Sequence, residues 1–319
     1  MPLTRRGVLF GSAAVALGFA TSSCGLVSTG GRRAGFPGTD EVTDALRDLV
    51  KKAGRDSFQK VDVSADGLLG ADLLLPDGSV QTYSFDKSWS KDHRDKKSEF
   101  TPPVSVRVRD LPLRHLAAFA RAPKTETTGV IIDVDYAGKI RVKAEPKGSA
   151  DAIGLKPDGT GTLPECDPET VRGVRSAVAE IVATYGTRAE RIGSFNGFVH
   201  IDANVAGCRA GVRIIREPRL AAQANFTQET PFDASRIFDP SGFDPTMAVT
   251  RKATIATEAR VDGKVWDWEY RRPDKGRAPQ LSYGIGPSGP DTRVWLDATG
   301  KIVSVSHGEC PKNTAWCPA

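Results

Sequence analysis

The chain has 319 residues, 39% of them hydrophobic, and its 44 lysines and arginines nearly balance 39 acidic residues. The basic residues are interspersed with acids, as in Lys87–Lys97, so the sequence lacks the long basic stripe that is typical of nucleic-acid binding. The length favours two domains over one, and the 32 glycines and 21 prolines favour short strands joined by turns over a helical bundle.

Residues 1–23 are predicted to be an export signal. Arg5 and Arg6 precede an apolar stretch that ends at Ala20, which is shorter than the roughly 20 apolar residues of a membrane-spanning helix. The paired arginines resemble those of signals read by the twin-arginine export route. Cys24, flanked by small residues, resembles the lipidation site of bacterial lipoproteins. This resemblance implies an acyl anchor such as palmitate on Cys24 and a mature chain held on the outer side of the cell membrane.

An ordinary signal peptide cut near this point is the alternative, and it would leave Cys24 as an incidental thiol. Removal of residues 1–23 takes away Arg5 and Arg6 and lowers the formal net charge from +5 to +3. The mature chain is therefore nearly balanced in charge.

The remaining cysteines are consistent with an oxidising compartment, because an even number is left if Cys24 carries lipid. Four cysteines allow three disulfide connectivities, and local closure favours two of the six pairs. Metal binding is disfavoured because paired C-x-x-C spacing is missing, and we expect neither a metal nor a cofactor. The favoured pairs are Cys166–Cys208 and Cys310–Cys317.

The first domain is expected to span residues 39–146, after a flexible tether at 24–38 that is rich in serine, glycine and arginine. Asp40 is predicted to cap a helix whose apolar stripe runs from Val42 to Ala53 and which ends at Gly54. Strands are predicted at 58–63, 68–75 and 79–85, a solvated loop at 87–97, a second helix capped by Asp110, and a hairpin at 130–142.

The second domain, residues 166–319, is predicted to repeat this order after a linker at 147–165. Asp167, followed by proline, is predicted to cap a helix that carries an apolar stripe from Val171 to Tyr185. Strands are predicted at 197–205 and 210–216, a shorter helix from Asp244 to Ala253, and further strands up to 297. The predicted fold class is α+β, with two similar halves, each a helix packed on a mainly antiparallel sheet.

A similar turn sequence occurs in both halves, at 135–140 (DYAGKI) and 297–302 (DATGKI). Aspartate and glycine suit a tight hairpin turn, and the β-branched residue restarts the strand. Helix-plus-antiparallel-sheet repeats that end in this turn resemble PepSY-type exported modules. The resemblance covers about a dozen residues per half and implies a shape, without assigning any site residue.

The sequence contains no serine-hydrolase elbow, no zinc-protease helix motif and no phosphate-binding loop motif. His200 alternates with Val199 and Ile201 in a predicted strand beside Asp202, an arrangement more typical of structure than of catalysis. An aromatic row on one strand face would bind a sugar, peptide or nucleobase if it is exposed, and would otherwise fill the core. The row consists of Trp266, Trp268 and Tyr270.

We therefore expect a membrane-anchored, extracytoplasmic module that binds a protein or small-molecule ligand and has no catalytic activity. One alternative is a carrier that holds a lipid or other apolar ligand between a helix and a curved sheet. A second is an extracellular hydrolase that uses dispersed carboxylates, which would require two facing acids of perturbed pKa.

Overall fold

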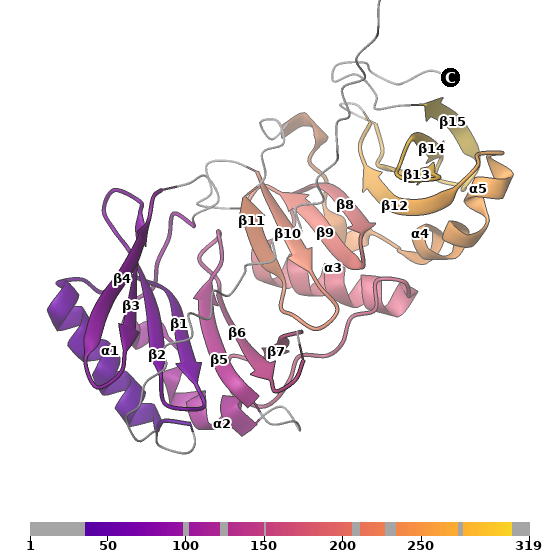
Figure 1. Cartoon of the computed structure of the whole chain (residues 1–319). Helices are drawn as coiled ribbons and strands as arrows, with labels where there is room; N and C mark the ends of the chain where they lie inside the picture. Colours follow the sequence, from indigo (N-terminus) through magenta and orange to yellow (C-terminus); the bar gives the residue numbers. More distant parts are fainter. Residues whose placement is uncertain are drawn as a thin grey trace, which may run out of the picture. The chain divides into compact units, whose positions relative to one another are not determined.

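The computed structural model describes residues 36–97, 102–121, 127–149, 151–205, 211–226, 234–273 and 277–307 (Figure 1). The predicted signal with Arg5 and Arg6, the predicted lipidation site Cys24, and Cys208, Cys310 and Cys317 lie outside these ranges. Within the described ranges, none of the helices has the length and apolar character needed to span a membrane.

The first half contains one seven-stranded antiparallel sheet with the strand order β4-β3-β2-β1-β5-β6-β7. Its elements are α1 (Thr39–Ala53), β1 (Phe58–Ser64), β2 (Leu69–Leu74), β3 (Val80–Phe85), β4 (Trp89–Asp95), η1 (Val108–Asp110), η2 (Leu113–His115), α2 (Leu116–Arg121), β5 (Thr127–Val134), β6 (Ile140–Pro146) and β7 (Ile153–Leu155).

The second half contains an eight-stranded antiparallel sheet with the order β11-β10-β9-β8-β12-β13-β14-β15. Its elements are α3 (Val171–Tyr185), β8 (Ala189–Phe195), β9 (Phe198–Ala203), β10 (Val212–Arg216), β11 (Gln223–Phe226), η3 (Ala234–Arg236), η4 (Pro240–Gly242), α4 (Thr246–Thr250), η5 (Arg251–Ala253), α5 (Ile255–Glu258), β12 (Lys264–Arg271), β13 (Gln280–Gly286), β14 (Thr292–Leu296) and β15 (Ile302–His307).

The two halves share one topology, which confirms the predicted α+β class with two similar halves. Each begins with a helix, continues through four consecutive strands, and returns through a helix-containing connection to a strand beside the first of the four. Strands β1–β4 therefore correspond in sheet position to β8–β11, and strands β5–β7 correspond to β12–β14. Strand β15 has no counterpart in the first sheet.

Each half buries the apolar stripe of its long helix against its sheet. Val42, Leu46 and Leu49 of α1 belong to a buried cluster that also contains Val61 and Leu73 of the first sheet. A second cluster joins one face of α3 to the second sheet in the same way. Residues three and four apart lie on one side of a helix, so the sequence period alone selects the buried face.

The helix starts differ from the predicted ones. Helix α1 has Gly38 at its N-cap, and Asp40 lies in its first turn. Thr170 caps α3 by accepting a hydrogen bond from the Gly173 backbone N–H. Asp167 was the predicted cap, but its carboxylate instead accepts from the Glu169 backbone N–H in a preceding turn. A hydroxyl directly before the helix reaches the free N–H groups better than a carboxylate three residues earlier.

Several predicted loops are strands. The charged run at 87–97 contains β4, whose side chains after Trp89 are exposed at the edge of the first sheet. The predicted linker contains β7, which pairs with β6 and completes the first sheet. Strands β8 and β11 were not predicted.

The two similar turn sequences do form similar hairpin turns. In each turn the glycine N–H donates to the aspartate carbonyl at 3.0 Å, and Gly138 and Gly300 have φ of 79° and 86°. Their places in the fold differ, because the first joins β5 to β6 and the second joins β14 to β15. The shared turn sequence is therefore local chemistry and does not mark equivalent positions of the two halves.

Candidate functional site

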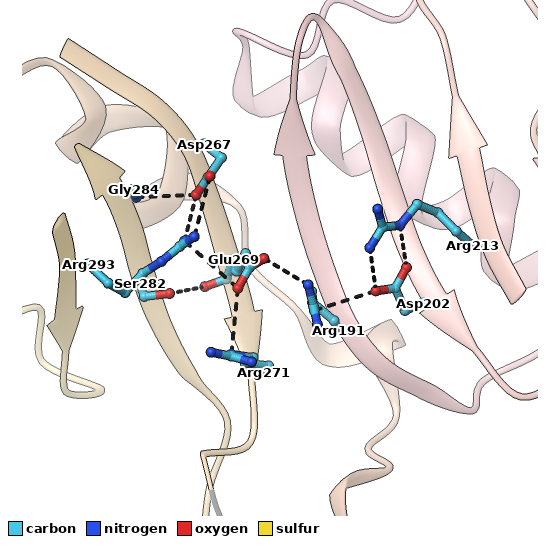
Figure 2. Close-up of polar contacts among 9 residues, drawn as sticks. All are labelled: Arg191, Asp202, Arg213, Asp267, Glu269, Arg271, Ser282, Gly284 and Arg293. Atoms are coloured by element: carbon cyan, nitrogen blue, oxygen red, sulfur yellow. Dashed lines mark hydrogen bonds and ion pairs between the residues drawn. The ribbon is translucent and has the colours of Figure 1, made fainter. Parts of the chain in front are cut away.

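A cluster of charged side chains lies on the face of the second sheet that is turned away from its core. Ile192, Ile201, Ile214 and Trp268 point into the core. Because successive side chains of a strand point to opposite faces, their neighbours project from the other face. We call this cluster the charged ladder; it consists of Arg191, Asp202, Arg213, Asp267, Glu269, Arg271 and Arg293 (Figure 2).

Strand register places opposite charges side by side at one end of the ladder. Asp202 of β9 lies between Arg213 of β10 and Arg191 of β8. Arg213 donates to both carboxylate oxygens of Asp202, at 2.7 and 2.9 Å, and Arg191 Nε lies 3.5 Å from Asp202 Oδ2. Two parallel hydrogen bonds of this kind are among the stronger side-chain interactions in proteins.

Glu269 of β12 joins the two ends of the ladder. Its Oε1 accepts from Arg191 Nη1 at 3.0 Å, and its Oε2 lies 3.5 Å from Arg271 Nε and 3.8 Å from Arg293 Nη1 (Figure 2). Arg191 and Arg271 are directly opposite each other in the register, so their repulsion is offset by the carboxylate between them. Glu269 therefore holds three guanidinium groups together.

Burial and charge act in opposite directions on the acids of the ladder. Burial alone would raise the pKa of Glu269, but Arg191, Arg293 and Arg271 hold it well below its usual range. Asp202 has a lowered pKa because the hydrogen bond from Arg213 and the charge of Arg191 outweigh its burial. Asp202 and Glu269 are thus carboxylates at neutral pH.

His200 lies beside the ladder and is the most unusual residue of this face. Its side chain is only 5% exposed, and neither ring nitrogen has a hydrogen-bond partner within the described part of the chain. Burial lowers the pKa of His200 to about 4, so the ring is neutral at physiological pH. A buried polar group without a partner is costly, and such groups are rare in folded proteins.

Asp202, Glu269 and His200 lack a hydrogen-bonded nucleophile within the described part of the chain. Asp202 and Glu269 are engaged by guanidinium groups, and no described hydroxyl or thiol is hydrogen-bonded to His200. A nucleophile–base pair requires such a bond. His200 can offer one donor and one acceptor to an incoming group.

The predicted aromatic row is divided by the structure. Trp268 is 1% exposed and stacks on Phe243 with ring centroids 5.7 Å apart, and Tyr270 packs against the same ring. A β-bulge between Val265 and Asp267 interrupts the alternation, and Trp266 donates from Nε1 to the Gly286 carbonyl at 2.9 Å. Trp268 and Tyr270 belong to the core, so the proposed ligand surface is not formed by this row.

Cys166 is a buried free thiol whose Sγ donates to the Gly173 carbonyl at 3.0 Å. Burial raises the pKa of Cys166. Its predicted partner Cys208 lies outside the described residues, as do Cys310 and Cys317, so both disulfides stay predictions. Among the described residues, no three His, Cys, Asp or Glu side chains are grouped as they would be around a metal ion.

The polar face of β12 is a sequence signal for the charged ladder, which an interpretation of its aromatic face alone misses. Asp267 and Glu269 alternate with the aromatic residues of the same strand, and Arg271 continues this polar face. The arginines that complete the ladder come from β8, β10 and β14, whose order in the sheet only the tertiary structure shows.

Comparisons with known proteins do not assign a family. No protein-family description and no curated protein matches the chain. Among solved structures, the PCNA2-PCNA3 complex from Sulfolobus tokodaii is similar at 11% identity, over 77% of this chain and 93% of that chain, with a TM-score of 0.14. A TM-score this low carries no argument, so the fold class rests on the strand order of the two sheets.

Proposed function

We propose that the mature protein is a lipid-anchored, extracytoplasmic binding or accessory module without catalytic activity, and that the charged ladder with His200 is its ligand-binding surface. The observation that carries the ligand site is the unpartnered, buried imidazole of His200. An unsatisfied buried polar group costs about 1–3 kcal/mol. A ligand that hydrogen-bonds to His200 would recover this cost on binding.

A ligand with a carboxylate group fits the chemistry of this face. The ladder contains four arginines and three acids, a formal charge of 4 − 3 = +1 while His200 is neutral. Guanidinium groups match the geometry of carboxylates, and a neutral imidazole N–H can donate to a carboxylate oxygen. The excess positive charge therefore favours an anionic ligand over a cationic one.

The two alternative functions receive less support. A carrier needs space between helix and sheet, whereas the buried faces of α1 and α3 belong to the same packed clusters as the strands. A hydrolase needs a carboxyl group that is protonated near neutral pH, whereas the pKa values of Asp202 and Glu269 are lowered. Burial raises the pKa of Asp267, but Arg293 donates to both of its carboxylate oxygens and so occupies them.

The anchor is tested in cells. The Cys24→Ala variant should leave the membrane fraction and appear in the soluble extracytoplasmic fraction, because an acyl anchor adds about 0.8 kcal/mol of binding per buried methylene. The pair Arg5→Lys and Arg6→Lys should block export, since lysine keeps the charge but loses the guanidinium geometry. Unchanged membrane association of Cys24→Ala would contradict the lipid anchor, and normal export of the double-lysine form would contradict the twin-arginine route.

The ligand site is tested with small carboxylates, for example acetate, succinate, citrate and glutamate, with inorganic phosphate for comparison. NMR of the histidine side chains should show a saturable change of the His200 signals with a carboxylate probe. His200→Leu should abolish the accompanying rise in melting temperature, whereas His93→Leu, at an exposed histidine of β4, should retain it. Lack of any perturbation of His200 by these probes would contradict the site.

A further inference from the structure

The two sheets have four edge strands, and three of these edges are closed in different ways. Strand β4 carries charged side chains along its edge, which disfavour pairing with another strand. Strand β7 is covered by its own chain: the Gly154 N–H donates to the Arg219 carbonyl, and the Gly154 carbonyl accepts from Leu163. Strand β11 is covered by the first half, since the Ala224 carbonyl accepts from the Tyr136 N–H at 3.0 Å.

The fourth edge, strand β15, lacks these protections within the described part of the chain. Its six residues Ile302–His307 include no Lys, Arg, Asp, Glu, Pro or Gly, and its described strand partner is β14 alone. Val303 is 44% exposed, the only large hydrophobic side chain among the described residues that is exposed. An uncharged edge strand of high β-propensity is a template for the addition of another strand.

We propose that β15 pairs antiparallel with β15 of a second copy of this chain, so that one sheet continues through both copies. The register follows from the two faces of the strand. Val305 lies opposite Val294, on the core face, and Ser304 and Ser306 lie opposite Trp295 and Arg293, on the other face. Directly opposed residues of antiparallel strands share a face.

A twofold axis at Val305 satisfies this condition. It places Val305 opposite the partner's Val305, Ser304 opposite the partner's Ser306, and Val303 opposite the partner's His307. Val305 then meets its own copy on the core face, and serines meet on the other face. Val303, which lies at a β-bulge in the pairing of β15 with β14, faces the partner's His307. Strand β15 contains no Asp, Glu, Lys or Arg, so two copies of the strand can pair without repulsion between these charged side chains. Both copies contribute the same surface to the interface, as in most symmetric dimers.

The register predicts which residue can be cross-linked between two copies. Directly opposed Cα atoms in an antiparallel pair are about 4.5–5.5 Å apart, which is within the range of a disulfide. Val305→Cys in the full-length protein should therefore give a disulfide-linked dimer in intact cells. Val303→Cys is the matched control, because the two copies of residue 303 would be about 13 Å apart, four residues along the strand.

A second measurement does not depend on an added cysteine. Two differently tagged full-length copies should co-purify, and Val303→Lys should reduce the co-purified fraction about tenfold by placing a charge on the edge. Val303→Thr, which remains β-branched and uncharged, should not. Dimers that form only after deletion of residues 308–319 would show that the chain's own tail occupies the edge. That result would overturn the proposal. It would also be overturned by equal cross-linking of the two cysteine variants, by cross-linking of Val305→Cys to a different protein, or by a lack of self-association in either assay.

Discussion

The imidazole of His200 lies across Gly193, its direct neighbour on strand β8. A Cβ atom at position 193 would be 2.5 Å from His200 Cε1, so glycine leaves the space that the ring occupies. The same relationship recurs at the other end of the ladder, where a Cβ at Gly284 would be 2.8 Å from the Asp267 carboxylate. Glycines in these two strands therefore allow polar side chains to lie flat on the sheet.

Replacement of Gly193 by alanine should destabilise the protein by about 1–3 kcal/mol, the usual cost of overfilling a packed site. The new methyl group would displace His200 and would also lie 2.9 Å from the Trp268 carbonyl oxygen. Urea unfolding measures the change. Gly242→Ala is the control, because nothing lies within 4 Å of a Cβ there. A double variant with His200→Ala should recover part of the loss, and full additivity of the two changes would contradict the contact.

His200 should make the protein less stable as the pH falls from about 6.5 to about 4. Burial lowers the pKa of His200 from 6.5 to about 4, although Asp202 and Glu269 oppose this and Arg213 and Arg191 reinforce it. In this window the unfolded chain binds a proton that the folded chain does not, so unfolding is favoured at lower pH. The loss should total roughly 3 kcal/mol and should level off below about pH 4.

The measurement compares the free energy of unfolding of the protein and of His200→Gln between pH 4.5 and 7. Glutamine keeps polar atoms at this position but does not titrate, so its stability should depend less steeply on pH. The carboxylates of the ladder are present in both proteins, so their contribution to the pH dependence of stability cancels in the comparison. Parallel pH profiles for the two proteins would show that His200 titrates normally in the folded state.

Glu269→Gln should destabilise the protein by about 3–5 kcal/mol, the range found when one partner of a buried ion pair is removed. The neutral amide would leave Arg191, Arg271 and Arg293 without the charge that offsets their mutual repulsion. Thermal and urea unfolding both report this loss. Asp44→Asn breaks an exposed pair with Arg47 and should change stability by less than about 1 kcal/mol. Equal effects of the two changes would contradict the central role of Glu269.

Asp135 is expected to be far more important for stability than Asp297, although each begins a hairpin turn of similar sequence. The Asp135 side chain is buried, and its Oδ2 accepts from the Tyr185 hydroxyl and the Ala224 N–H. Asp135→Ala would leave these donors unsatisfied and should cost about 3 kcal/mol or more in urea unfolding.

Two further variants isolate the cause. Tyr185→Phe removes one donor to Asp135 and should cost about 1.5–3 kcal/mol. Asp297 bonds within its own turn, to Thr299 and Lys301, and Asp297→Ala should have a smaller effect than Asp135→Ala. If Asp297→Ala were as destabilising, the contacts from Tyr185 and Ala224 would not explain the role of Asp135.

Local patterns in the sequence were sufficient to predict much of the fold. The apolar stripes of α1 and α3 identify the helices and their buried faces, because helical spacing depends on neighbours only three and four residues apart. Gly54, with φ of 67°, ends α1 as predicted, since glycine adopts this conformation readily. The hairpin turns at Gly138 and Gly300 were predictable for the same reason.

The tertiary structure alone decided which strands are neighbours and therefore where the charged ladder lies. Arg191, Asp202 and Glu269 are far apart in the chain, and they meet because β8 lies between β9 and β12. A charged run such as β4 is a strand because it can pair with β3 at a sheet edge, which its composition does not reveal. Secondary structure depends mainly on local spacing, whereas a site built across strands depends on pairing between distant segments. That pairing leaves no local pattern in a single sequence.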